Sequence, residues 1–295
     1  MIKIGTADSA KVIEIPQTKG INRPSFSKFL IYFFLILWSI TTVYPFLWVV
    51  NCSFKTTSQI LNNSFELSLD PIFTNYINAF EKQNILRSYM NSLIISGSVT
   101  LIVMLLATMA AFAITRYDFR GKKFVKKLII CSLMFPAFST IIPVFKMIAK
   151  MGLINNPLGV IAPQIAGNLS FAIIVMMGFI DTIPMDLEES AFLDGCNIMQ
   201  IFNKVIVPLS RPSRATVAIF TFLWSYNDLF TQIIIIRDRK MYPICALLNE
   251  ISSKYGTDFG LMAASVTLII IPVMIVYICL QKNIISGLTA GAVKG

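Results

Sequence analysis

The stretch NSLIISGSVTLIVMLLATMAAFAI, residues 91–114, decides the fold class. It contains no charged side chain, and an α-helix of about 20 such residues spans the hydrocarbon of a bilayer. Further apolar runs of similar length lie at 29–50, 128–149, 161–180, 216–236 and 261–280. These runs lack the in–out alternation of barrel strands, so the sequence predicts an all-α membrane protein with six transmembrane helices.

Composition and charge agree with a membrane location. Hydrophobic residues make up 56% of the 295 residues and charged residues only 14%, which lies outside the usage of soluble domains. The net charge of +10 does not indicate a nucleic-acid partner, because the basic residues lie between apolar runs. Sixteen Lys and Arg fall in the connections on the N-terminal side of the membrane and eight on the other, so both termini are predicted to be cytoplasmic.

The predicted organisation follows from these runs. Residues 1–28 form a cytoplasmic segment, 29–280 a six-span domain of a bacterial inner membrane, and 281–295 a cytoplasmic tail. The basic connection 115–127 fixes the orientation most firmly. Pro136 and Pro143 predict a break or kink in the third span. The connection 51–90 is long, which leaves open short amphipathic structure or a docking surface there.

Most enzymatic chemistry lacks its residues in this chain. It contains no histidine, and its five cysteines are scattered without a CxxC pair, which argues against triads and metal sites. No GxxxxGK[ST] loop is present to cradle a triphosphate. The acids at 181–194 are explained by helix-start electrostatics. The sequence therefore predicts a non-catalytic chain with no cofactor or metal of its own.

The connection between the fourth and fifth spans, residues 181–214, is predicted to hold two short helices. Pro184 can open the first helix, whose first turn carries Asp186, Glu188 and Glu189 at the positive end of the helix dipole. Gly195 permits a tight reversal.

The second helix of this loop is predicted from Asn197 and Gln200, which have capping-box spacing. Its apolar residues recur at helical spacing until Pro208 ends the run: Ile198, Ile201, Phe202 and Val205. This apolar face needs membrane helices or a partner protein to cover it.

Residues 189–195, ESAFLDG, and 205–208, VIVP, resemble the EAA loop of ATP-binding-cassette importer permeases. The resemblance implies the type I ABC importer permease fold, in which this loop forms a coupling helix seated in a cleft of an ATPase subunit. Ser190 and Cys196 stand where the family usually has alanine. The residues to which the resemblance assigns the coupling role are Glu188, Glu189, Ser190, Ala191, Asp194, Gly195 and Pro208.

The chain's end, GLTAGAVKG at 287–295, resembles the tail of the maltose-type, MalG-like permease subunits. The order of spans, basic loop, EAA segment and tail follows that subfamily over most of the chain. The resemblance implies that Gly291, Lys294 and Gly295 contact the ATPase subunits. Composition alone favours a frayed end.

The fifth span contains polar residues at membrane depth, which must face protein or water instead of lipid. The candidate substrate pathway is Trp224, Tyr226, Asn227 and Asp228. Trp224 can stack on a sugar ring and Asn227 can bond its hydroxyls. Asp228 is also a candidate for gating or for a charge pair with Lys146 of the third span, and a purely structural network is the alternative.

The resemblance implies a permease subunit that imports a di- or oligosaccharide by alternating access. Its implied partners are a second homologous permease in a heterodimer, two cytosolic ATPases that bind ATP and magnesium, and an extracytoplasmic sugar-binding protein. From the residues alone, an ion-coupled secondary transporter that uses Asp228 or Lys146 is the alternative. Such a carrier has no need of an amphipathic cytosolic helix pair.

Overall fold

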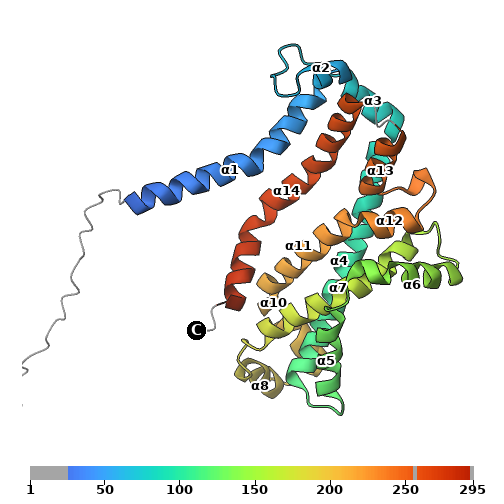
Figure 1. Cartoon of the computed structure of the whole chain (residues 1–295). Coiled ribbons are helices and arrows are strands. Elements are labelled where there is room, and N and C mark those ends of the chain that lie inside the picture. The colour runs from blue at the N-terminus through green and yellow to red at the C-terminus, as the bar shows by residue number, and fades with distance from the viewer. Residues whose placement is uncertain (1–25, 255–257, 293–295) are drawn as a thin grey trace, which may run out of the picture. The chain divides into compact units, whose positions relative to one another are not determined.

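The structure is a computed structural model that describes residues 26–254 and 258–292. Every regular element in these ranges is a helix (Figure 1), which confirms the all-α prediction. The chain divides into two compact units, residues 1–45 and 46–295. Nearly all of the predicted cytoplasmic segment 1–28, and the tail residues Lys294 and Gly295, lie outside the described residues.

Helix α1, Phe26–Ser53, begins in the first unit and corresponds to the first predicted span. Most of its apolar side chains are exposed. The hydroxyls of Ser39, Thr41 and Thr42 donate to carbonyls four residues earlier, at 2.8 Å each. The helix therefore presents an apolar surface with satisfied polar groups, as hydrocarbon requires.

The long connection after α1 holds two short helices, α2 (Thr57–Asn62) and α3 (Thr74–Gln83). Buried polar groups tie this connection to the end of α1. Lys55 is 4% exposed, and its ammonium donates to the carbonyls of Asn63 and Glu66. Asn75 donates to the carbonyls of Ser53 and Lys55 at 2.9 and 2.8 Å. The alternative of short local structure in this connection is thus confirmed.

Helix α4, Ile85–Arg116, is the central element of the second unit, and it packs along α7, Pro157–Ile180, and α11, Arg211–Asn227. Its buried face is rich in small residues, which allow close helix contact in a membrane. They include Ser88, Ser92, Ser96, Ala107 and Ala111. Helices α4 and α7 confirm the second and fourth predicted apolar segments, and each starts earlier than predicted.

The third predicted apolar segment is broken into two helices. Two helices occupy this stretch, α5 at Lys122–Ser132 and α6 at Ala137–Lys150. Pro136 adopts extended backbone at the N-cap of α6, since its ring and missing N–H do not suit a helix interior. The break predicted from the prolines is confirmed here, whereas Pro143 lies inside α6.

The fifth span was wrongly predicted as one helix. Helix α11 ends at Asn227, and α12, Leu229–Ile235, follows after Asp228. A 3-10 turn at Arg239–Met241 and α13, Ile244–Lys254, lead to α14, Phe259–Ala292. Helix α14 thus continues through the predicted boundary at 280 and includes Gly291. Among the described residues, three helices are long and apolar enough to cross a membrane: Lys28–Ser53, Ile85–Arg116 and Pro157–Ile180.

Candidate functional site

The 181–214 loop folds as a chain of short helices, of which α8 and α10 are labelled in Figure 1. Helix α8, Asp186–Leu193, has three acids in its first turn, as predicted. Gly195 has φ +83°, a conformation that favours glycine, and it reverses the chain. Helix α9, Ile198–Ile201, starts with the predicted capping box: the Asn197 side chain accepts from the Gln200 backbone, and the Gln200 side chain accepts from that of Asn197.

Pro208 does not end the second helical run. A π-helical stretch, Phe202–Ile206, precedes α10, Val207–Leu209, and Pro208 lies within α10. The Val207 N–H donates to the carbonyl of Phe202, five residues back. We attribute the accommodation of the proline ring to this wider turn, because a regular helix would press the ring against the carbonyl four residues earlier.

The inner face of the 181–214 loop is buried against the membrane helices. Ile183, Ile201, Phe202 and Ile206 are each 7% exposed or less, and all of them except Ile201 belong to the core that α4, α7 and α11 help to build. The ring of Phe202 lies 5.6 Å from that of Phe112 on α4. The membrane helices therefore cover part of the predicted apolar face, while Ile198 remains exposed.

Two adjacent glutamates of α8 have opposite environments. Glu188 is buried, and its carboxylate accepts from Arg116 Nε at 2.5 Å, with side-chain exposures of 11% and 8%. Arg116 also donates from Nη2 to the carbonyl of Ile183 at 2.7 Å. Glu189 is exposed. Burial, together with the negative charge of Glu188, raises the pKa of Tyr117, the residue after α4.

The outer face of this loop presents uncovered apolar side chains. We call the following residues the apolar tip: Met185, Leu187, Phe192, Leu193, Ile198 and Met199. Leu193 is 86% exposed and Phe192 is 67% exposed. Ser190, Asp194 and Gly195 are exposed around them, and Ala191 is half-buried. A group of large exposed apolar side chains on one short loop is typical of a protein-docking site.

The second candidate region is the helix break at Asp228. The Asp228 carboxylate caps α12 by accepting from the Thr231 N–H at 3.2 Å, and it accepts from Gln164 Nε2 of α7 at 2.9 Å. The Ser225 hydroxyl donates to Gln164 Oε1 at 2.6 Å and lies 3.2 Å from the Ser96 hydroxyl of α4. Gln232 Nε2 donates to the Ser225 carbonyl at 3.0 Å. Side chains thus satisfy backbone groups that the break releases.

The predicted pathway residues do not share one face of α11. Trp224 is 47% exposed and packs edge-on against Phe171, 4.9 Å away, and beside Phe220; we call these three residues the aromatic platform. Asn227 is exposed and donates to the Leu223 carbonyl. Tyr226 is 2% exposed and is packed in a separate core with α13 and α14. Residues two positions apart on an α-helix, such as Trp224 and Tyr226, are rotated about 200° around the helix axis, which explains why they lie on different faces.

The expected charge pair between Asp228 and Lys146 is not formed. Lys146 is exposed on α6, and the partners of the Asp228 carboxylate are an amide and a backbone N–H. Both residues lie in the described part of the chain, where the ion pairs are Arg116–Glu188 and Lys122–Asp118. The pair with Lys146 was one of several alternatives for Asp228, and sequence spacing could not place Gln164 next to it.

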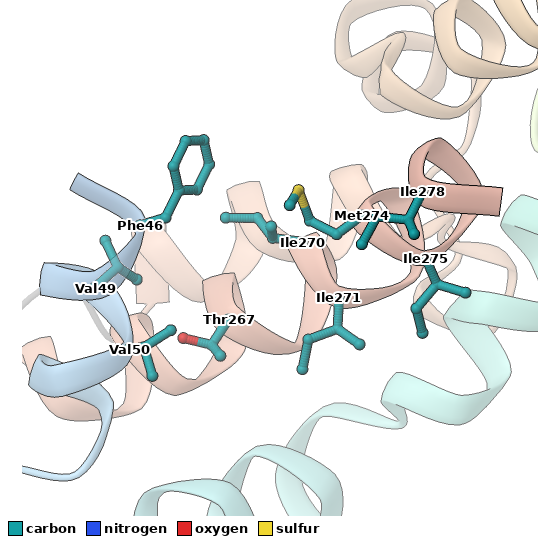
Figure 2. A pocket seen from close by; sticks show the side chains of 9 residues that line it. All are labelled: Phe46, Val49, Val50, Thr267, Ile270, Ile271, Met274, Ile275 and Ile278. Atoms are coloured by element: carbon teal, nitrogen blue, oxygen red, sulfur yellow. The ribbon is translucent and has the colours of Figure 1, made fainter. Parts of the chain in front are cut away.

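The second unit also contains an apolar groove of about 260 Å³ between the end of α1 and α14 (Figure 2). Phe46, Val49 and Val50 face isoleucines and Met274 of α14. Its one polar side chain, Thr267, donates its hydroxyl to the Ala263 carbonyl. The groove therefore offers no polar group suited to a sugar, and it shares no residue with either candidate region.

Comparison with known proteins decides the family. The family of binding-protein-dependent transport system inner membrane components matches residues 103–289. The chain belongs to this family. The match contains the 181–214 loop, the helix break and the aromatic platform, so both candidate regions lie in the part that defines a transport permease.

Relatives over nearly the whole chain agree with this family membership. The diacetylchitobiose uptake system permease protein NgcG of Streptomyces coelicolor is 32% identical and covers 88% of this chain and 87% of its own length. The galactooligosaccharides transport system permease protein GanQ of Bacillus subtilis is 34% identical, covering 90% and 94%. A bacterial ABC transporter involved in alginate import has the same fold, with a TM-score of 0.76 at 23% identity over 87% of this chain and 96% of that chain.

Membership in a binding-protein-dependent permease family does not support the ion-coupled alternative. The carbohydrate ABC permease resemblance is confirmed by the same relatives.

Sequence analysis missed Arg116, Gln164 and Phe171, which complete the two regions. Arg116 was included only as one of the basic residues of the connection 115–127. The signal that could have identified it is its position at the end of a long apolar helix, on the same predicted side of the membrane as a loop rich in acids.

Proposed function

We propose that this chain is one of two permease subunits of an ATP-binding-cassette importer that carries a di- or oligosaccharide into a bacterial cell. The named relatives transport diacetylchitobiose and galactooligosaccharides, and others transport trehalose and arabinooligosaccharides. An extracytoplasmic binding protein delivers the sugar, and two cytosolic ATPases bind ATP and magnesium in trans. The second permease completes a heterodimer around the pathway.

The observation that carries this proposal is the two-faced 181–214 loop. Its inner face is packed on α4 and α7, and its apolar tip projects away from them with Leu193 86% exposed. Glu189, Ser190, Ala191, Asp194 and Gly195 lie beside the tip, and Pro208 lies within α10. Closure of the ATPases on ATP moves this loop, and the two permeases then rock between outward-open and inward-open states.

Several features support cytoplasmic placement of both termini. Arg116 contacts Glu188, so the basic connection after α4 and the 181–214 loop lie at the same end of α4. The positive-inside rule puts that end in the cytoplasm. With six membrane segments, the N-terminal segment and the tail lie on this side too, where Gly291, Lys294 and Gly295 of the tail contact the ATPases.

The proposed sugar contacts are on the aromatic platform. Trp224 is half exposed and its ring is held by Phe171 and Phe220 at centroid distances of 4.9 and 5.8 Å. A fixed aromatic face suits the apolar face of a sugar ring, and the nearby Asn227 and Asp228 suit its hydroxyls. Tyr226 supports this surface from the core behind it.

Copurification and transport together test the proposal. The complex is purified from membranes through a tag on this chain, and its proteoliposomes are assayed for ATP-dependent import of galactooligosaccharides, arabinooligosaccharides, diacetylchitobiose and trehalose. Recovery of a second permease and an ATPase, with import of one of these sugars, is the expected result. Import driven by an ion gradient without an ATPase would contradict it.

Two variants localise the ATPase contact. Leu193→Asp puts a charge into the apolar tip and is expected to abolish ATPase copurification. Leu69→Asp is the matched control, because Leu69 is 85% exposed but belongs to the connection after α1. Loss of the ATPase from both variants, or from neither, would contradict docking at the tip.

A further inference from the structure

We infer that α4 is the rod that carries the movement of α8 to the helix break at Asp228, and that Arg116 is the positioning residue that fixes α8 to this rod. The inference rests on the proposed function, since it names the route by which ATPase closure reaches the pathway. It begins from the opposite environments of Glu188 and Glu189 on α8.

The first step is the attachment of α8 to α4. Arg116 holds Glu188 at 2.5 Å and the Ile183 carbonyl at 2.7 Å, so one guanidinium joins α8 and the start of its loop to the last turn of α4. Both side chains of the ion pair are about nine-tenths buried. A buried charge pair resists separation, because each partner would be left without its counterion in a poorly solvated site. Movement of α8 therefore pulls the end of α4 with it.

The second step is the path along α4. This helix is uninterrupted from Ile85 to Arg116 and contains no proline. Ser96, twenty residues before Arg116, lies about 30 Å along the axis at the helical rise per residue. Its hydroxyl lies 3.2 Å from that of Ser225, which also donates to Gln164 at 2.6 Å. One uninterrupted helix thus contacts α8 at its end and the helix break at Ser96, in its first half.

The third step concerns the helix break at Asp228, to which α4 carries the movement. Asp228 separates α11 from α12. At this break the Ser225 carbonyl accepts a hydrogen bond from the Gln232 side chain. Hydrogen bonds between neutral side chains exchange partners more readily than a buried ion pair separates, because each lost bond is individually weaker. A shift of α4 at Ser96 is therefore able to rearrange the break, whereas the Arg116–Glu188 contact stays intact.

The test compares the amount of sugar imported per ATP hydrolysed in proteoliposomes, using the sugar of the four-member panel that the wild-type complex imports best. Glu188→Gln removes the charge of the contact, and we expect the ratio to fall about tenfold while the ATPase still copurifies, as for loss of one charge-assisted bond. Asp118→Asn is the matched control, because the Lys122–Asp118 pair is exposed at the same end of α4. We expect the Asp118→Asn variant to import as much sugar per ATP hydrolysed as the wild type.

A conservative variant decides the outcome if Glu188→Gln fails to assemble. Glu188→Asp keeps the charge and draws the carboxylate back by one methylene, so a lowered ratio in an intact complex supports the inference. A wild-type ratio in the variant that assembles overturns it, even if the amount of complex falls, because a purely structural contact changes abundance only. Failure of the wild-type complex to import any panel sugar counts against the proposed function instead.

A double-mutant cycle tests the path itself. Ser225→Ala removes the contact with Ser96, and it is combined with Glu188→Asp. If both changes interrupt one route, the double variant should import about as much sugar per ATP hydrolysed as the single variant with the lower ratio. The reason is that the effects of strongly coupled sites are not additive. Independent, multiplying losses would overturn α4 as the common carrier.

Discussion

The 181–214 loop holds a buried carboxylate and the helix break holds the half-buried carboxylate of Asp228, and the two charges are compensated differently. Glu188 faces a guanidinium, whereas Asp228 faces an amide and a backbone N–H. A buried ion pair is costly to separate, while a hydrogen bond from a neutral donor to a carboxylate contributes less, about 1.5–3 kcal/mol. The difference indicates a loop built to move as one body and a break built to rearrange.

The largest effect is expected from breaking the ion pair. Arg116→Leu leaves Glu188 buried without its cation, at a cost of about 3–5 kcal/mol. Thermal unfolding of the purified complex measures this loss. The double variant Arg116→Leu/Glu188→Leu is the control, and it should recover most of the stability, because apolar replacement of both partners of a buried pair is often nearly neutral. Equal destabilisation in the two would show that packing, not charge, holds α8.

A smaller effect is expected at the helix break. Gln164→Leu removes the bond to Asp228 and the acceptor of the Ser225 hydroxyl, which should cost about 1.5–3 kcal/mol. Asp228→Asn is the companion variant. Asparagine caps helices as well as aspartate and still accepts from Gln164, so its thermal unfolding should change by less than about 1 kcal/mol. If Asp228→Asn costs as much as Gln164→Leu, the charge matters there too and the contrast with Glu188 fails.

A still smaller effect is expected at the aromatic platform. Trp224→Ala removes an aromatic contact of about 0.5–1.5 kcal/mol, so the sugar concentration for half-maximal import should rise roughly three- to tenfold. Phe230→Ala is the control, since Phe230 is also 47% exposed but packs on Phe138 outside the platform. An equal change in both variants would remove the platform from the sugar path.

Local signals predicted much of this molecule. Apolar length identified α1, α4 and α7, and the capping box at Asn197 and the reversal at Gly195 were predicted because each depends on neighbours in sequence. The predicted end of the second helical run, at Pro208, was wrong, because the spacing of apolar residues does not reveal the π-helical stretch before it.

Contacts between distant residues could not be predicted. Arg116 and Glu188 are 72 positions apart, and Gln164 and Asp228 are 64 apart. The break at Asp228 depends on Gln164 and Gln232 to satisfy the freed backbone groups, so the apolar run alone indicated one continuous span. The same limit applies to the candidate Asp228–Lys146 pair, because opposite charge was the available signal and the tertiary positions of the two residues were not known.

The smallest effect is expected from Tyr226→Phe. The Tyr226 hydroxyl is buried without a hydrogen-bond partner among the described residues, while its ring stacks on Phe222 at 5.8 Å, a contact that phenylalanine keeps. Removing an unsatisfied buried group should leave the unfolding temperature unchanged or raise it slightly.

Tyr89→Phe provides the matched control for this change. The Tyr89 hydroxyl donates to the Leu268 carbonyl of α14, so its loss should cost about 1 kcal/mol, the typical net value of one hydrogen bond. A Tyr226→Phe variant that keeps its stability but imports more slowly would return Tyr226 to the pathway predicted from the sequence. The break would then expose this hydroxyl in another transport state, as a region that rearranges requires.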